Sequence, residues 1–141
     1  MKIVECTTKE EGEIVLNGIN TYNDSQTERI LEKVHENIKL VAKNDANEII
    51  GGIFGYIGYY AGFKIDILWM REDTRRLGLG TKLLKEAENR AKKLGATIAI
   101  LDTFSFQAED FYLKNGYKVF GRISDYPKEN QEFVFLKKDL K

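Results

Sequence analysis

Helical and strand-like hydrophobic spacings follow one another in the first 36 residues. Residues 2–7 predict a short strand in which Cys6 is a small buried hydrophobic side chain. Residues 9–36 have helical spacing, and the polar break at 23–25 supplies N-cap side chains for a second helix. His35 stands near the end of that helix, where it would compensate the helix dipole. The inward positions of the two helices are Ile14, Leu16, Ile19, Tyr22, Ile30, Leu31 and Val34. The pattern therefore predicts a strand followed by two helices.

An antiparallel meander is predicted for residues 38–70. Residues 38–43 alternate as a strand, the polar stretch 44–47 is a hairpin turn, and residues 48–60 return as a long strand. A short turn then leads into a third strand at 63–70. Four glycines in the second strand predict a bulge or the close approach of another group.

A strand–helix–strand unit is predicted for residues 65–104. Residues 80–94 carry apolar side chains on one stripe with lysine and glutamate opposite, and Gly95 is a natural end of this helix. Residues 97–104 are almost continuously apolar, which is typical of a buried parallel strand. A right-handed crossover should therefore place the two strands of this unit parallel to each other.

The C-terminal residues complete the predicted sheet. A short helix at 107–115 ends at Gly116, and strands follow at 117–123 and 131–137. The expected fold class is α/β, more fully an α+β mixed sheet with helices on both faces. The expected order of elements is β-α-α-β-β-β-α-β-α-β-β.

Charge and composition limit the classes of function. The 22 basic and 22 acidic residues cancel, so no general attraction for nucleic acid or an anionic membrane is expected. Residues 1–141 suffice for a single domain with its own core. One cysteine excludes an internal disulfide and a multi-cysteine metal site, and we expect no metal. Without a signal peptide or a run of about 18 apolar residues, a cytoplasmic protein is expected.

The turn between the strand at 65–70 and the helix at 80–94 predicts an anion site. It reads Arg75-Arg76-Leu77-Gly78-Leu79-Gly80. The first N–H groups of a helix have no partner inside the helix, and the helix dipole adds to their attraction for an anion. The two glycines allow a ligand to approach the backbone closely. We therefore expect a phosphate-bearing ligand here.

Three glycine-rich loop patterns can be compared with this turn. The P-loop requires Gly-Lys-Ser/Thr, whereas this chain has Gly80-Thr81-Lys82. The dinucleotide fingerprint requires a third glycine where Leu83 stands, and it belongs to an all-parallel unit. The third pattern, Arg/Gln-x-x-Gly-x-Gly/Ala between a strand and a long helix, fits residues 75–80 at every position.

A second segment carries a family pattern together with this loop. Residues 105–117 resemble Asn-x-x-Ala-x-x-aliphatic-Tyr-x-Lys-x-Gly-Phe, with Ala108, Tyr112, Lys114 and Gly116 in register. Ser105, Phe111 and Tyr117 depart from that pattern. From about residue 38 onward the sequence resembles the GNAT family of N-acetyltransferases. The runs 101–108 and 125–127 are similar to small bacterial acetyltransferases of that family.

The resemblance implies acetyl-coenzyme A as the donor. Backbone N–H groups from Arg76 to Thr81 would receive the pyrophosphate, and the pantetheine arm would pair with the backbone of residues 68–70. Whether the Arg75 and Arg76 side chains also touch phosphate stays open. The implied coenzyme A contacts are Leu68, Trp69, Met70, Arg75, Arg76, Leu77, Gly78, Leu79, Gly80, Thr81, Ser105, Ala108, Phe111 and Lys114.

The resemblance also implies direct transfer to an amine. Tyr112 would be the acid that protonates the departing thiolate, and a water chain ending at Asp66 would remove the proton of the amine. The acceptor would be a small-molecule or peptide amine, with Asn23, Asp24, Tyr56 and Tyr59 as lining candidates. A homodimer paired through the C-terminal strands is possible. The alternatives are a non-catalytic acyl-CoA-binding module and a nucleotide-binding regulatory domain.

Overall fold

The computed structural model describes residues 1–32 and 35–141. It divides the chain into two compact units, Met1–Ile30 and Leu31–Lys141, which are described separately. A single domain over the whole chain therefore stays a prediction.

The first unit consists of one helix, α1, at Lys9–Gln26. Thr8 is its N-cap, since the Thr8 side chain accepts a hydrogen bond from the Glu11 N–H, and the Glu11 carboxylate accepts one from the Thr7 N–H in return. The predicted strand at 2–7 is wrong, because no strand forms there. The expected burial of Cys6 is also wrong, because its side chain is exposed.

The prediction of two helices in residues 9–36 is wrong for the described part of that segment. Helix α1 runs through the expected break at 23–25, where the Ser25 hydroxyl donates to the Tyr22 carbonyl oxygen instead of capping a new helix. Residues 27–32 form no helix, and Val34 lies outside the described residues. His35 begins a strand opposite Gly58, since pairing with the sheet outweighs local helical spacing.

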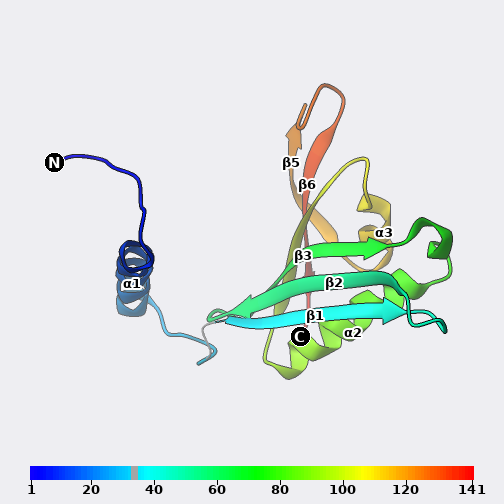
Figure 1. Cartoon of the computed structure of the whole chain (residues 1–141), viewed down its shortest axis with the longest axis horizontal. Coiled ribbons are helices and arrows are strands. Elements are labelled where there is room, and N and C mark those ends of the chain that lie inside the picture. Colours follow the sequence, from blue (N-terminus) through cyan, green and yellow to red (C-terminus); the bar gives the residue numbers. More distant parts are fainter. Residues whose placement is uncertain (33–34) are drawn as a thin grey trace. The chain divides into compact units, whose positions relative to one another are not determined.

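The second unit is built on a mixed six-stranded sheet in the order β1-β2-β3-β4-β6-β5. The predicted meander is confirmed, because β1 to β3 pair antiparallel in sequence order. The strands are β1 at His35–Lys43, β2 at Ile49–Gly58, β3 at Gly62–Met70, β4 at Ile98–Phe104, β5 at Lys118–Ser124 and β6 at Glu132–Asp139. Figure 1 shows the β5–β6 hairpin extending beyond the other strands.

Strands β3 and β4 separate after a short parallel contact. They are paired from Gly62 opposite Ile98 to Lys64 opposite Ile100, and the register ends there. The parallel crossover is therefore confirmed. Residues 65–70 of β3 keep their pairing with β2 but have no ladder on the β4 side. This opening leaves a free backbone edge at the C-terminal end of β3.

The predicted irregularity of β2 is confirmed as a register shift between Phe54 and Gly55. Phe54 lies opposite Ile67 and Gly55 lies opposite Ile65, so Asp66 is the extra residue of a bulge on β3. A Cβ atom on Gly55 would lie 2.7 Å from a ring carbon of Phe63, which explains the glycine at this position.

Helix α2, at Leu79–Lys93, packs its apolar stripe against β1, β2 and β3 (Figure 1). The short helices are the 3-10 turn η1 at Glu72–Thr74 and α3 at Glu109–Lys114. The core beneath α2 contains Ile53, Ile57, Phe63, Leu84, Ala87 and Leu101, which are almost fully buried. Among the described residues, no helix is long and apolar enough to cross a membrane.

Candidate acyl-transfer site

The turn from β3 into α2 presents a row of backbone N–H groups. Gly78 is the N-cap of α2 in the left-handed conformation, with φ 78°, and Arg76 also has a positive φ of 67°. In the part of the chain that the structure describes, no hydrogen bond occupies the N–H groups of residues 76–81. Successive free donors at a helix N-terminus suit an anion, so the phosphate site expected from the sequence stays a prediction that this geometry fits.

The two arginines of this turn have different surroundings. Arg75 donates from Nε to the Met70 carbonyl oxygen at 3.1 Å, which ties the turn to the end of β3. No described residue hydrogen-bonds the Arg76 guanidinium, and both arginines line the cavity described below. Thr74 is buried and donates from its hydroxyl to the Arg71 carbonyl oxygen at 2.7 Å, which closes the preceding 3-10 turn.

Gly80 lies at a packing contact that the sequence pattern did not reveal. A Cβ atom at this position would lie 3.4 Å from a ring carbon of Phe111 and 3.6 Å from the Met70 side chain. These are ordinary van der Waals distances, so alanine would also fit, and the first turn of α2 lies directly beside α3 and the end of β3. The turn before α2 and helix α3, which carries Tyr112, are therefore neighbours.

A cavity of about 580 Å³ lies where these segments meet. It is lined by the end of β3, the turn before α2 and the start of α3. Most of the lining residues are ones that the sequence indicates, namely Leu68, Trp69, Met70, Arg75, Arg76, Gly78, Gly80, Thr81, Ala108, Phe111 and Tyr112. Thr74, Phe106 and Gln107 also line it and were not predicted, although they lie in or beside the two segments that carry the family pattern.

Five of the assigned residues do not line this cavity: Leu77, Leu79, Ser105, Lys114 and Asp66. Leu77 is exposed, and Leu79 begins α2, so each can offer only its backbone N–H at the turn. Ser105 instead joins β4 to β6, because its N–H donates to the Glu132 carbonyl oxygen and its Oγ accepts from the Glu132 N–H.

Tyr112 reaches the cavity from α3. Its side chain is only 5% exposed, and no described residue hydrogen-bonds its hydroxyl group. Burial, and to a smaller extent the charge of Asp102, raises the pKa of Tyr112 to about 12. The hydroxyl therefore keeps its proton at neutral pH and is available as a donor.

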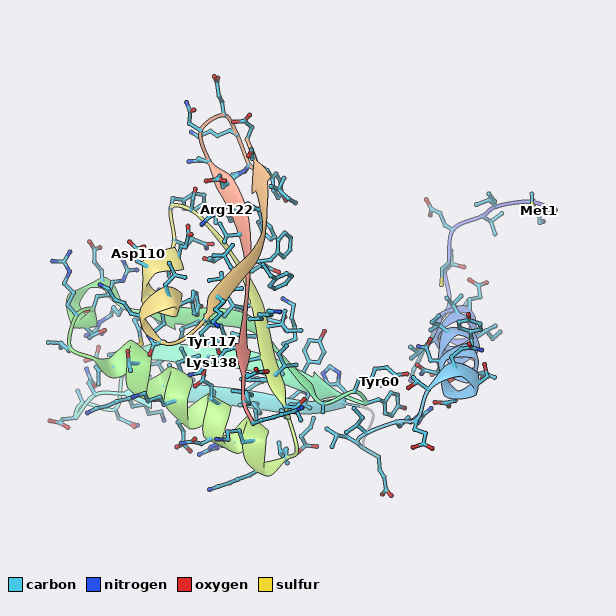
Figure 2. All side chains as sticks on the ribbon, turned by 180° about the vertical axis from the view of Figure 1, so that it is seen from behind. Met1, Tyr60, Asp110, Tyr117, Arg122 and Lys138 are labelled. Atoms are coloured by element: carbon cyan, nitrogen blue, oxygen red, sulfur yellow. The ribbon has the colours of Figure 1, made fainter. Side chains whose placement is uncertain are left out.

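Tyr112 rests on a second tyrosine. The rings of Tyr112 and Tyr117 meet edge to face at 5.6 Å between centroids. Tyr117 donates to Glu88 Oε2 at 2.7 Å, and Lys138 Nζ donates to Glu88 Oε1 at 2.8 Å (Figure 2). Burial and the hydrogen bond to Glu88 raise the pKa of Tyr117 far above its usual value. This triad, in which Glu88 and Tyr117 are buried and Lys138 is partly exposed, joins α2, the residue before β5 and β6.

Two carboxylates lie near the opening between β3 and β4. Asp66 is on the bulge, where both it and Ile67 are exposed, so its carboxylate stays in contact with solvent. Asp102 lies on β4 just beyond the last β3–β4 pair, and Lys64 Nζ contacts its Oδ2 at 3.1 Å.

Comparison with known proteins identifies the family to which this fold belongs. The model of the acetyltransferase (GNAT) domain matches residues 35–119, which is more than half of the chain. The chain therefore belongs to the GNAT family of acetyltransferases. The matched region includes the turn before α2 and Tyr112.

Two relatives illustrate this membership, and a third solved structure shares the fold. Blasticidin-S acetyltransferase of Streptomyces morookaense is 34% identical over 87 residues, which span 61% of this chain and 63% of that protein. The crystal structure of an acetyltransferase from Bacillus cereus is 38% identical, with a TM-score of 0.84 over 98% of this chain and 97% of the other. Aminoglycoside 6'-N-acetyltransferase, solved with coenzyme A, is 19% identical with a TM-score of 0.68, over 75% of this chain and 74% of the other, and this likeness is one of fold.

Proposed function

We propose that the chain transfers an acetyl group from acetyl-CoA directly to a primary amine of a small molecule. The main support for this proposal is that one cavity is lined both by the N-terminal turn of α2 and by Tyr112. The unpaired N–H groups at the start of α2 lie at one part of it, and the Tyr112 hydroxyl comes from another. Family membership supports acetyl-CoA as the donor.

The residues present fit the donor. The N–H groups of residues 76–81 suit a pyrophosphate because they are unpaired and stand at a helix N-terminus. The free edge of β3 at residues 68–70 suits an amide-bearing pantetheine arm, which would pair with it as an added strand. The same edge can offer a backbone N–H to the oxyanion of the reacting carbonyl.

Acetyl-CoA supplies a thioester, whose carbonyl carbon is attacked by the amine nitrogen as the carbon–sulfur bond breaks. Tyr112 donates a proton to the departing sulfur, for which its raised pKa keeps it protonated. No covalent intermediate on the protein is needed, and the one cysteine, Cys6, belongs to the separate unit Met1–Ile30.

The amine must lose a proton before or during attack, and two carboxylates can receive it through water. Asp66 is the residue expected from the sequence, and its place on an exposed bulge makes it accessible to solvent. Asp102 is the second candidate, because it is close enough to Tyr112 to contribute to the raised pKa of that tyrosine. A water chain ending at one of them completes the proton transfer.

A small-molecule acceptor is supported by the relatives. The names of two of them state an antibiotic substrate, blasticidin-S in one and an aminoglycoside in the other. A peptide amine is the alternative acceptor within the same chemistry. A homodimer also stays a prediction; β5 is an edge strand of the sheet and could pair with a second copy.

The experiment is binding of acetyl-CoA by calorimetry, followed by release of free thiol with a panel of small amines and short peptides. We expect micromolar-range binding and turnover with at least one small amine. Binding without turnover for any amine would favour the non-catalytic acyl-CoA-binding module instead. Absence of coenzyme A binding would contradict both proposals and reopen the regulatory-domain interpretation.

A further inference from the structure

Six aromatic rings form a continuous cluster on β4, β5, β6 and their loops. Phe104 is its centre, stacked on Phe106 with 5.3 Å between centroids and an angle of 6° between planes. Phe133 meets Phe104 edge to face at 4.8 Å, and Tyr126 does so at 5.5 Å. The remaining members extend the cluster along the hairpin: Phe135 contacts Phe133 at 5.0 Å, and Phe120 contacts Phe135 at 6.0 Å.

This aromatic cluster brings together two sequence runs whose purpose was unexplained. The first is the segment at 101–108 and the second is the turn at 125–127. Residues 109–124 separate them in the chain, yet Tyr126 of the second run packs on Phe104 of the first, and also on Phe133. A purely structural role would favour burial, but Phe106 is 59% exposed and Tyr126 is 47% exposed.

The loop that carries Phe106 is held rigidly. The Gln107 side-chain oxygen accepts hydrogen bonds from the Phe104 N–H at 2.7 Å and the Thr103 hydroxyl at 3.2 Å. Ser105 is bonded to the backbone of Glu132 in both directions. The stacked pair Phe104 and Phe106 is therefore positioned before any ligand arrives, which lowers the entropic cost of binding.

The turn that carries Tyr126 is closed in the same way. Its N–H donates to the Gln131 carbonyl oxygen at 3.0 Å, and the Asp125 carboxylate accepts from the Asn130 N–H at 3.0 Å. Arg122 on β5 bridges Glu109 of α3 and Glu132 of β6, which fixes the hairpin beside the first helix turn (Figure 2). Both exposed rings thus stand on fixed backbone.

The cluster is continuous with the acyl-transfer cavity. Phe106 belongs to both, since it lines the cavity that Tyr112 lines and also stacks on Phe104. A molecule lying on the exposed ring of Phe106 can extend into the cavity that Tyr112 also lines. This is the placement that an acceptor needs for its amine to reach the thioester.

We infer that this aromatic cluster is the platform for the acceptor, and that the acceptor carries a planar aromatic ring beside its amine. The inference rests on the proposed acetyl transfer and names its substrate class. Flat rings stack on aromatic faces with offset or edge geometry, which a saturated ring cannot reproduce. The ammonium group of an incoming amine is also attracted to the ring faces.

The test compares two primary amines that differ only in the ring, 2-phenylethylamine and 2-cyclohexylethylamine. Binding of each is titrated by nuclear magnetic resonance, with the chain free and with saturating coenzyme A. The saturated ring is the more hydrophobic of the two, so preference for the phenyl ring reports aromatic recognition. We expect the phenyl compound to bind about two- to ten-fold more tightly.

The variants are Phe106→Leu and Tyr126→Leu, which keep apolar volume and remove the ring. Each should reduce the preference to less than about two-fold, while coenzyme A affinity of Tyr126→Leu stays unchanged because Tyr126 does not line the cavity. Tyr60→Leu is the matched control, an exposed tyrosine at the β2–β3 turn away from Arg122 and the hairpin (Figure 2). It should keep the full preference.

Three results would overturn the platform. One is equal binding of the two amines by the unmodified chain. Another is a preference that survives in both leucine variants. A third is loss of a dimer in these variants, seen by sedimentation, with the preference unchanged, which would make the cluster an interface between copies. Because the readout is amine binding, failure of acetyl transfer itself is detected separately by the thiol-release assay.

Discussion

The Tyr117 hydroxyl donates a hydrogen bond of 2.7 Å to Oε2 of Glu88, and both side chains are almost fully buried. Glu88 comes from the helix whose first turn presents the anion site, and Tyr117 supports the ring of Tyr112. One buried pair therefore connects the loop proposed to bind the donor with the tyrosine proposed to act as the acid. Lys138 provides the second partner that a buried carboxylate needs.

Replacing Tyr117 with phenylalanine should lower stability without removing the fold. The change leaves Glu88 Oε2 buried without its donor, and a lost hydrogen bond to a charged group costs about 1.5–3 kcal/mol. Urea unfolding at neutral pH measures this difference. Tyr60→Phe, at an exposed position, is the control and should change stability by less than about 0.5 kcal/mol. Equal stability of the two variants would show that the triad contributes nothing.

Stability should fall at alkaline pH through the buried tyrosines. The pKa of Tyr112 is raised from 10.0 to about 12 in the folded chain, and that of Tyr117 is raised further. A raised folded pKa gives stability that is complete below about pH 10 and is lost as pH rises through the folded value. Between these values the unfolded chain ionises first, so unfolding becomes easier.

The measurement is urea unfolding at several values between pH 8 and 11. The free energy of unfolding of the unmodified chain should fall over this range. That of Tyr112→Phe should fall less, because the contribution from ionisation of Tyr112 is absent. Lysine titration affects both proteins alike and cancels in the comparison. If the free energies of unfolding of the two proteins changed with pH in parallel, Tyr112 would have the same pKa in the folded and the unfolded chain.

Tyr112→Phe should lower turnover far more than donor affinity. Loss of a general acid typically reduces the rate by about 10²- to 10⁴-fold, whereas the ring and its contacts with Phe111 and Tyr117 are kept. Single-turnover thiol release measures the rate, and calorimetry with coenzyme A measures affinity. Unchanged turnover across the pH range would remove the acid assignment.

Gly78→Glu should weaken coenzyme A binding by about ten-fold or more, since it places a carboxylate beside the proposed phosphate donors and loses charge-assisted hydrogen bonds. Space alone is not limiting, because a Cβ atom here would meet nothing within 4 Å. Gly78→Ala is the matched control, as it carries the same strain from φ 78° without the charge. The charge effect is the difference in affinity between the two variants. Equal coenzyme A affinities of the two variants would mean that the pyrophosphate does not bind at this turn.

Asp66→Asn and Asp102→Asn should separate the two candidates for the proton acceptor. Only the true end of the water chain should give a rate loss of about 10²-fold or more that is greatest at low pH. Asp102→Asn should also lower the pKa of Tyr112, because the charge of Asp102 helps to raise it. The pH dependence of turnover distinguishes these effects. Two variants with full activity would exclude both carboxylates.

Most of the second unit could be predicted from the sequence because its signals are local. Alternating residues from 38 onward, the turn at 44–47 and the stripe of residues 80–94 specify strands, turn and helix through side-chain spacing alone. The candidate anion site could be proposed from the sequence as well, since a glycine at an N-cap needs only its neighbours in the chain. The first helices could not be predicted in the same way, because α1 continues through 23–25 and His35 begins β1 by pairing with β2, which helical spacing does not encode.

Tertiary structure decided the relationships between distant residues. Asp66 does not share the face of Leu68 and Met70, because β3 has a bulge between them and Ile65, and strict alternation along the strand does not predict that shift. Asp102 meets Lys64, Glu88 meets Tyr117, and Tyr126 meets Phe104 across separations that sequence spacing does not encode. The sequence by itself thus determined most elements of the second unit and predicted the donor loop and the role of Tyr112. Only the packing of strands and loops determined which charged and aromatic groups surround them, because those contacts form when the sheet assembles.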